Sequence, residues 1–270
     1  MAMTEAPETD TLPPHAGGIP ATLTEDGFLG GRLRMLQPEK GFRAGIDSVF
    51  LAASIPCVAG ESVFEVGMGT GVAALCLIAR QPAIHLTGIE IAGRYAMLAE
   101  ENARRNGFAA NLKVIHADVK DALRKGAAKM PEPGTFTHAM ANPPYFEAGS
   151  ITSSPHILKA QAHAFGAEDL KLWVKLAYAM VAARGTMTVI HRAESLGKLL
   201  AAMDGRFGDL RVAPLFPRVG AAASRVIVQG VKDSKAPLRI LPGLVLHGEG
   251  TGFTPEAEQI LRDGAAWSLR

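Results

Sequence analysis

The chain has 270 residues, 48% of them hydrophobic and 20% charged, with a formal net charge of +2. This length and apolar content suffice for one large domain with a full core. No apolar run reaches the roughly 18 residues that a transmembrane helix needs, and the N-terminus lacks the basic start of a signal peptide, so we expect neither a membrane span nor secretion.

The charge is unevenly distributed. The first 26 residues hold five acidic side chains and no Lys or Arg, so they carry −5 and the rest of the chain carries +7. Two groups of basic residues could therefore form a phosphate-facing surface, although solvated helix faces explain scattered charges equally well. The groups are Arg32, Arg34, Lys40 and Arg43, and Arg184, Arg192, Arg218 and Arg225.

Cysteine usage indicates an intracellular enzyme. Cys57 and Cys76 are the two cysteines of the chain, and neither has a CxxC partner or a His cluster beside it. We expect both to be reduced packing residues, with no disulfide framework and no zinc or other metal site. A cytoplasmic protein is the expectation.

The N-terminal quarter of the chain has two parts. Residues 1–22, rich in Pro, Thr and Ala, predict a disordered tail. Residues 24–36 combine turn glycines with alternating Arg and apolar residues, which indicates a β-hairpin. We expect residues 23–60 to form this hairpin and a helix that leads into the core, and residues 61–270 to form the main domain.

Strands and helices then alternate, which favours an α/β fold with a mostly parallel sheet and helices on both faces. Strands are expected at 63–66, 85–90, 112–116, 136–140 and 186–191, and helices from 72 onward, from 119 onward and over 167–183. Two last strands, at 210–214 and 224–231, are expected to form an antiparallel hairpin and to complete a seven-stranded sheet. Ligands of such sheets bind at the carboxyl ends of the strands.

The tetrapeptide Asn142-Pro143-Pro144-Tyr145 ends the fourth predicted strand and is the most informative stretch of the sequence. Its chemistry suits methylation of a planar amine or amide nitrogen, whose delocalised lone pair attacks poorly. The side-chain oxygen of Asn142 and the carbonyl of Pro143 could each accept one N–H and favour the transition state, in which the nitrogen becomes tetrahedral and positive.

The prolines hold these acceptors in place before the substrate arrives. Each proline fixes its own φ near about −65°, and Pro143 also biases Asn142 toward an extended conformation. Tyr145 offers a flat face on which a nucleobase can stack, an interaction worth about 1–3 kcal/mol. The alternative is an ordinary strand-ending turn, because Asn and Pro are common turn residues.

A glycine-rich turn after the first main-domain strand supplies a site for a methyl donor. Glu65, Gly67, Gly69 and Gly71 form the pattern acidic-x-Gly-x-Gly-x-Gly, followed directly by an apolar helix. The glycines permit positive φ and close approach of a ligand to the backbone. The spacing differs from the Gly-x-Gly-x-x-Gly of dinucleotide sites, and the leading carboxylate suits S-adenosylmethionine, whose sulfonium and amino group are cationic. A strand-helix turn without a ligand is the alternative.

Two more acidic residues fall at strand ends. Glu90 lies about twenty residues after the glycine turn, where an acidic residue binds a ribose diol in nucleotide folds. Asp118 follows the third strand and could accept a hydrogen bond from an adenine amino group. Asp118 could instead be the N-cap of the helix that begins at Val119.

On these motifs, and on residues 36–53, the chain resembles the class I S-adenosylmethionine-dependent methyltransferases. Within them it is similar to the subfamily that methylates N6 of adenine 37 in the anticodon loop of valine tRNA. The resemblance extends from about Thr24 to the C-terminus and implies a Rossmann-like fold, S-adenosylmethionine as the cofactor and tRNA as the substrate. It also implies that Arg43 and Asp47 contact the cofactor site, although Asp47 could equally cap a helix that begins at Ser48.

The sequence departs from the subfamily at one place. Relatives usually carry an Arg in an Ala-Arg-aromatic-like segment after the tetrapeptide, where this chain has His163. An Arg is permanently charged and grips phosphate, whereas a His is charged only in part near neutral pH. The departure places the RNA contact, and hence the exact substrate, in question.

The mechanism that the resemblance implies is direct methyl transfer to N6 of an adenine extruded into a pocket that Tyr145 covers. Asn142 and Pro143 would hold the amine in line with the sulfonium. Rival enzymes are a protein glutamine N5-methyltransferase, which usually begins with a helical domain, and an rRNA guanine N2-methyltransferase. A nicotinamide oxidoreductase is disfavoured by the glycine spacing, and a catalytically inactive RNA-binding protein by the intact motifs.

Overall fold

The computed structural model describes residues 22–124, 127, 130–144 and 167–270. Nearly all of the tail predicted at 1–22 lies outside these residues, as do Tyr145 and His163. The expected small hairpin is present: β1 (Leu23–Phe28) pairs antiparallel with β2 (Leu33–Pro38), with η1 (Leu29–Gly31) between them.

The main sheet contains the seven predicted strands. They are β3 (Ser62–Val66), β4 (His85–Glu90), β5 (Leu112–His116), β6 (Phe136–Ala141), β7 (Val181–Arg192), β8 (Phe207–Phe216) and β9 (Arg225–Lys232). Their spatial order is β8-β9-β7-β6-β3-β4-β5. The five strands from β7 to β5 are parallel, and β9 pairs antiparallel with both β7 and β8. Two strands of two residues, β10 (Arg239–Ile240) and β11 (Leu244–Val245), extend the sheet along β8.

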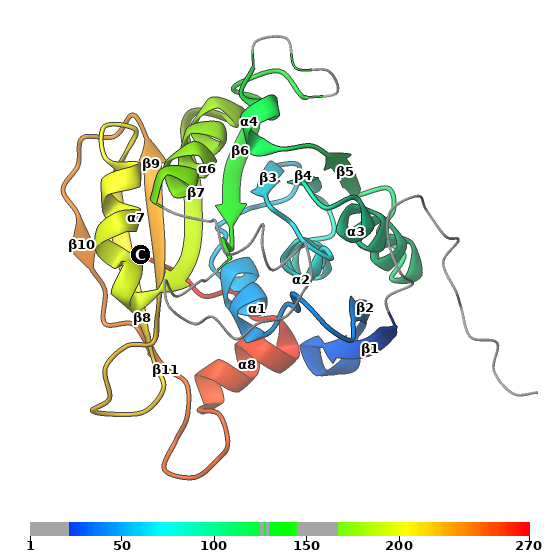
Figure 1. Cartoon of the computed structure of the whole chain (residues 1–270). Coiled ribbons are helices and arrows are strands. Elements are labelled where there is room, and N and C mark those ends of the chain that lie inside the picture. Colours follow the sequence, from blue (N-terminus) through cyan, green and yellow to red (C-terminus); the bar gives the residue numbers. More distant parts are fainter. Residues whose placement is uncertain (1–21, 125–126, 128–129, 145–166) are drawn as a thin grey trace, which may run out of the picture.

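Helices cover both faces of the sheet (Figure 1). One face packs against the hairpin and the helices α1 (Ile46–Ala53), α2 (Val72–Arg80), α3 (Gly93–Arg105) and α8 (Pro255–Asp263). The other face packs against α4 (Val119–Ala122), α6 (Ala167–Met180) and α7 (Leu196–Met203), the last preceded by η2 (Ala193–Ser195). Alternate residues of β3 go to opposite sides, Val63 to the first cluster and Phe64 to the second, as the pleat of a strand requires.

The boundary between α6 and β7 differs from the prediction. The helix ends at Met180 and the strand begins at Val181, whereas the sequence pattern placed these limits at 183 and 186. Lys232 explains the early helix end, because its Nζ donates to the carbonyls of Tyr178 (2.8 Å) and Val181 (2.6 Å). The first residues of β7 then pair irregularly with β6, and Arg184 takes a positive φ of 65°.

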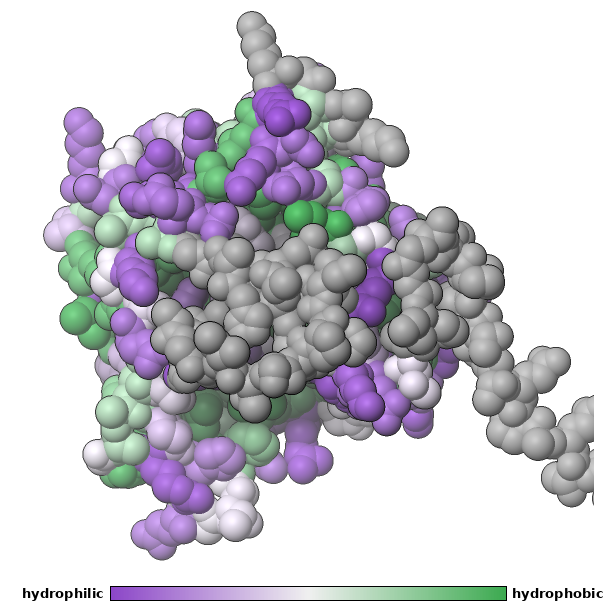
Figure 2. All heavy atoms as spheres, in the orientation of Figure 1, coloured by the Kyte–Doolittle hydropathy of each residue, from purple (hydrophilic) through white to green (hydrophobic). Residues whose placement is uncertain are grey.

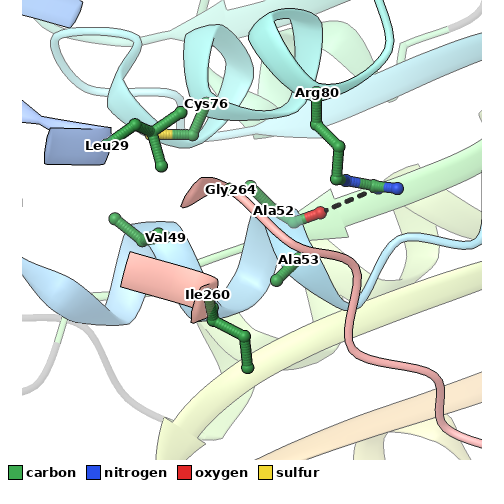
Figure 3. A pocket seen from close by; sticks show the side chains of 8 residues that line it. All are labelled: Leu29, Val49, Ala52, Ala53, Cys76, Arg80, Ile260 and Gly264. Atoms are coloured by element: carbon green, nitrogen blue, oxygen red, sulfur yellow. Dashed lines mark hydrogen bonds between the residues drawn. The ribbon is translucent and has the colours of Figure 1, made fainter. Parts of the chain in front are cut away.

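Helix α8 and the last residues of the chain close the side of the molecule near α1, an arrangement that the sequence patterns did not predict. A small cavity remains between α1, α2 and α8 (Figure 3). Arg80 borders this cavity and donates to the carbonyls of Ala52 (3.1 Å) and Ile55 (2.6 Å) at the end of α1. Cations are favourable at helix C-termini, so Arg80 has a structural role here.

Cys57 and Cys76 are buried and unpaired with each other, as expected for packing residues. In the described part of the chain, no helix has the length and apolar character that crossing a membrane requires, and no three or more His, Cys, Asp or Glu side chains are grouped to hold a metal ion. Where residues are coloured in Figure 2, hydrophilic and hydrophobic ones are interspersed.

Candidate active site

The glycine turn and the Asn-Pro-Pro segment lie side by side at the carboxyl edge of the sheet. Strands β3 and β6 are neighbours, with Glu65 opposite Met140 and Val66 opposite Ala141. The chain leaves β3 into the glycine turn and leaves β6 into Asn142. The strand order reverses between β3 and β6, and such switch points are where open α/β sheets bind ligands.

Positive φ is required at each of the three glycines of the turn, with values of 69°, 56° and 84° at Gly67, Gly69 and Gly71. At Gly67 there is also no room for a side chain, because an added Cβ would lie 2.0 Å from Cη2 of Trp173. Trp173 belongs to α6 on the opposite side of the glycine turn from α2. The sequence predicted that a ligand would lie close to the backbone of this turn. At Gly67, the indole ring of Trp173 lies there instead.

Glu90 holds the glycine turn against the end of β4. Its Oε2 accepts from the backbone N–H of Gly69 at 2.8 Å, and its Oε1 accepts from that of Ala92 at 2.9 Å. The side chain is buried, and loss of water raises the pKa of the carboxyl, an effect that the backbone donors oppose. Each carboxylate oxygen has a second lone pair, so hydroxyl groups of a ligand can still donate to Glu90.

Glu65 lies deeper and has an unmatched acceptor. It is 2% exposed, and its Oε2 has no hydrogen-bond partner among the described residues. Burial, and next the neighbouring Glu90 charge, raise the pKa of Glu65 well above its usual range, while the backbone N–H of Ala74 at the start of α2 opposes this. The hydroxyl of Thr70, also buried, likewise lacks a partner in the described part of the chain. Unmatched buried polar atoms are costly, so these two atoms suit a polar, cationic ligand on the turn.

Asp118 is the N-cap of α4. Its side chain accepts from the backbone N–H of Lys120 at 2.7 Å. The capping alternative is thus confirmed. A capping carboxylate retains lone pairs, and Asp118 stands beyond β5 at the same edge of the sheet as Glu90, so the predicted adenine contact stays a prediction.

Asn142 is oriented by α1. Its Nδ2 donates to Oγ of Ser48 at 3.4 Å, and the arrowhead of β6 points toward α1 in Figure 1. Ser48 is 3% exposed and is fixed on the first turn of the helix. Pro143 is buried and Pro144 partly buried, which restricts the backbone that follows Asn142.

Asp47 and Arg43 have partners within the protein. Helix α1 begins at Ile46 with Gly45 as its N-cap, so the alternative in which Asp47 caps a helix starting at Ser48 is wrong. Asp47 instead forms an ion pair with Arg225 of β9 at 2.8 Å. Arg43 contacts the hairpin and donates to Oδ2 of Asp26 (2.5 Å) and Oγ1 of Thr24 (2.6 Å). The predicted cofactor contacts of both residues stay predictions.

Members of both basic groups form ion pairs within the protein. In the first group, Arg34 pairs with Glu25 (3.0 Å), which also pairs with Arg105 (2.7 Å), and Arg43 pairs with Asp26, so acidic side chains of β1 are partners of two of its four members. In the second, Arg192 of β7 stands directly opposite Arg225 of β9 at the carboxyl edge of the sheet.

The other two members of the second basic group lie in different places. Arg218, in the loop between β8 and β9, donates to the carbonyls of Gly248 (2.7 Å) and Gly250 (2.8 Å). Arg184 lies near the opposite end of β7. Arg192 and Arg225 are thus the two members of the second group that lie together at the carboxyl edge of the sheet.

Sequence reasoning missed three side chains around the turn. Trp173 lies in the helix predicted over 167–183, for which no ligand contact was predicted. Phe42 is 42% exposed, and its ring lies 3.2 Å from the position of a Cβ on Gly69; Ile91 follows Glu90 and is 52% exposed. Exposed apolar side chains near the buried polar groups of the turn suit a flat ring of a ligand. The position of Ile91, directly after the acidic residue, was the available signal.

Comparison with known proteins gives a consistent set of matches. The model of the methyltransferase small domain family matches residues 43–184. A protein from Actinobacillus succinogenes named tRNA1(Val) (adenine(37)-N6)-methyltransferase is 26% identical over 239 residues, covering 88% of this chain and 96% of the relative. A protein of the same name from a Flavobacteriaceae bacterium is 33% identical over 111 residues, covering 41% of this chain and 45% of the relative.

Two solved structures are similar in fold. A protein from Agrobacterium tumefaciens, described as a predicted O-methyltransferase, superposes with a TM-score of 0.69 at 26% identity, covering 82% of this chain and 98% of that chain. A tRNA methyltransferase from Aquifex aeolicus superposes with a TM-score of 0.51 at 18% identity, covering 74% of this chain and 73% of that chain.

Proposed function

Since the chain belongs to the methyltransferase small domain family, we propose that it transfers the methyl group of S-adenosylmethionine to N6 of an adenine in tRNA, in the anticodon loop. The observation that carries the proposal is the juxtaposition of Asn142, at the end of β6, with the glycine turn at the end of the neighbouring β3. The match to the Actinobacillus succinogenes relative with this activity in its name covers 88% of the chain. A tRNA substrate favours a cytoplasmic location.

The residues of the turn fit the cofactor. Glu90 would accept from the ribose hydroxyls, and Ile91 beside it offers an apolar surface for the adenine ring. The unmatched Oε2 of Glu65 and Oγ1 of Thr70 supply polar groups for the methionine part. When bound, the cofactor supplies an electrophilic methyl group on a positively charged sulfur.

The protonation of Glu65 is linked to binding of the cofactor. In the protein alone, burial and the nearby Glu90 raise the pKa of Glu65 and favour its neutral form. A cation in the turn favours the ionised form. Binding of the cofactor is therefore linked to proton release from this carboxyl, and the affinity rises with pH through the titration of Glu65.

Asn142 and Pro143 act on the substrate amine. The Oδ1 of Asn142 and the carbonyl of Pro143 accept the two N–H groups of the adenine amine and turn its lone pair toward the methyl group. The hydrogen bond from Asn142 Nδ2 to Ser48 fixes the amide plane before the substrate binds, which reduces the reorganisation needed in the transition state. The methylated nitrogen is strongly acidic and loses its extra proton without a dedicated base.

The RNA backbone would lie along the edge that carries Arg192 and Arg225. Like charges directly opposite on neighbouring strands destabilise a sheet, and these two arginines have Glu194 (2.9 Å) and Asp47 (2.8 Å) as acidic partners. Asp47 and Ser48 are consecutive in α1, so the Arg225 ion pair lies next to the Ser48 to Asn142 bond. A phosphate near these arginines would therefore flank a nucleotide whose base enters the site.

The rival substrates fit less well. The glutamine N5-methyltransferases usually begin with a helical domain, whereas β1 and β2 form a hairpin here. The structural neighbour described as a predicted O-methyltransferase shares the fold, but an alcohol oxygen has no pair of N–H groups for Asn142 and Pro143 to accept. A nitrogen substrate uses both acceptors.

The test is incubation of the purified protein with methyl-labelled cofactor and separate pools of tRNA, rRNA and protein, followed by nucleoside analysis. We expect label in N6-methyladenosine from tRNA. Label confined to protein would instead support a protein glutamine N5-methyltransferase, and label in guanine from rRNA would support an rRNA guanine N2-methyltransferase.

A further inference from the structure

Asn102 of α3 and Asn106, the C-cap of this helix, attach the N-terminal hairpin to the main domain. Asn102 and Asn106 are one helical turn apart and therefore face the same way. The Oδ1 of Asn106 accepts from the backbone N–H of Arg34 (3.0 Å), and its Nδ2 donates to the carbonyl of Arg34 (2.9 Å). Asn102 repeats this pair of bonds on Leu36, at 2.7 and 3.0 Å. The side-chain amides thus take the place of a further strand along β2.

The two amides differ in their third bond. The Nδ2 of Asn102 also donates to the carbonyl of Thr70, in the glycine turn, at 3.0 Å. The Nδ2 of Asn106 donates instead to a carbonyl of its own helix, that of Asn102, at 2.8 Å. Asn102 is fully buried and uses both N–H groups and its oxygen in these contacts.

Asn102 therefore joins three segments that are distant in the sequence: the edge of β2, helix α3 and the turn between β3 and α2. The carbonyl of Thr70 lies between Gly69, whose N–H is held by Glu90, and Gly71, the N-cap of α2. Two consecutive residues of the turn are thus fixed from outside it: Glu90 accepts from the N–H of Gly69, and Asn102 donates to the carbonyl of Thr70. A backbone with three positive-φ glycines needs such external constraints, because glycine has many alternative conformations.

We propose that Asn102 is a positioning residue for the cofactor, which couples docking of the N-terminal hairpin to the shape of the glycine turn. The inference rests on the proposed function only in taking this turn as the S-adenosylmethionine site. Asn106 docks the hairpin equally but has no bond to the turn. Loss of Asn102 should therefore reduce cofactor affinity, and loss of Asn106 should not.

The experiment compares the parent chain with Asn102→Asp, Asn102→Ala, Asn106→Asp and Asn106→Ala. The Asp variants keep the shape and the acceptor for the β2 backbone N–H but lack both N–H donors, so they test the donor bonds with the least change in packing. Calorimetric titration with S-adenosylhomocysteine gives the dissociation constant, measured well below the melting temperature of each variant. Hydrogen exchange of the Gly69 and Gly71 amides gives the order of the turn.

We expect both Asn102 variants to raise the dissociation constant at least tenfold, equivalent to about 1.4 kcal/mol, and to speed amide exchange in the turn. The Asn106 variants should lower the melting temperature yet change the dissociation constant less than twofold. Equal effects of the two asparagines on affinity, or no effect of either, would overturn the inference.

The titration also separates this inference from the proposed function. A parent that binds the cofactor but does not methylate tRNA refutes the proposed substrate alone, and the comparison of variants still decides the role of Asn102. A parent that does not bind the cofactor refutes the inference together with the cofactor assignment.

Discussion

Replacement of Glu90 by Gln perturbs the cofactor site at a residue whose contacts are known. Glu90 accepts two backbone N–H groups, from Gly69 at 2.8 Å and Ala92 at 2.9 Å. A glutamine has one acceptor oxygen and one NH2 group, so it keeps one of these bonds and places a donor against the other N–H. Either the N–H of Gly69 in the turn or that of Ala92, the N-cap of α3, then loses its acceptor.

The expected magnitudes follow from these bonds. Hydrogen bonds to a charged acceptor contribute about 1.5–3 kcal/mol, and part of this is offset because ionised Glu90 is itself disfavoured by burial. We expect the free energy of unfolding to fall by about 1–2 kcal/mol. Loss of a charged acceptor for a ribose hydroxyl adds about 1.5–3 kcal/mol to the free energy of binding, or roughly a 10- to 100-fold weaker dissociation constant.

Denaturant unfolding and calorimetric titration with S-adenosylhomocysteine measure the two effects. Glu100→Gln is the matched control, because Glu100 lies on the exposed side of α3. The control should change stability by less than about 0.5 kcal/mol and leave affinity unchanged. A Glu90→Gln protein that binds the cofactor as tightly as the parent would refute the assignment of Glu90 to the ribose.

Three further predictions concern stability. Gly67→Ala should lower the free energy of unfolding by at least about 3 kcal/mol, because the new Cβ would overlap the ring of Trp173 and φ is 69° at this position. In a double-mutant cycle, Trp173→Ala in the same chain should remove part of this loss. Burial lowers the pKa of His191 to about 4. In the unfolded chain His191 binds a proton near pH 6.5, whereas in the folded protein it does so only near pH 4. The free energy of unfolding should therefore fall as the pH decreases through this window. Between pH 7 and 4.5, the fall should be about 2 kcal/mol larger in the parent than in His191→Gln. Arg80→Met should lower the free energy of unfolding by about 2 kcal/mol, because the carbonyls of Ala52 and Ile55 lose a charged donor.

Denaturant titrations check all three, and each has a contradicting result. Strictly additive costs of Gly67→Ala and Trp173→Ala would show that the two side chains do not meet. Parallel pH profiles of the parent and His191→Gln would show that His191 titrates alike in both states. A neutral Arg80→Met would mean that water satisfies the carbonyls at the end of α1.

The fold could be predicted from the sequence because its signals are local. Strand runs such as His85–Glu90 and Leu112–His116 match the observed bounds, since each is an apolar run between turn residues. The end of α6 was misplaced because Lys232, 52 residues beyond Met180, bonds to the carbonyl of Tyr178 in the last turn of the helix and to that of Val181, the first residue of β7. No local pattern near residue 180 carries that information.

The sequence motifs of the candidate site could be predicted, but the contacts that hold these motifs in place could not. Glu65, Glu90 and Asn142 stand at strand ends, and the parallel topology brings strand ends together. The contacts that fix them come from residues distant in the sequence: Ser48 for Asn142, and Asn102 for the glycine turn. Such contacts depend on how α1 and α3 pack, which a single sequence does not reveal.

The same limit applies to the charges. Arg43 and Arg34 formed part of a candidate phosphate surface because their acidic partners could not be recognised from the sequence. Asp26 and Glu25 are adjacent to one another on β1; the hairpin register brings Glu25 near Arg34, whereas Arg43 follows β2 and pairs with Asp26 from outside the hairpin. Net charge alone did not reveal these pairs.

The most direct test of the central claim is a comparison of Asn142→Ala with the parent in two assays, cofactor titration and single-turnover methylation of tRNA. Asn142 contacts Ser48 and stands outside the glycine turn, so we predict an unchanged dissociation constant for S-adenosylhomocysteine and a loss of N6-methyladenosine formation of at least about 100-fold, the range seen when one transition-state acceptor or donor is removed. Methylation by the variant at the parent rate would contradict the account.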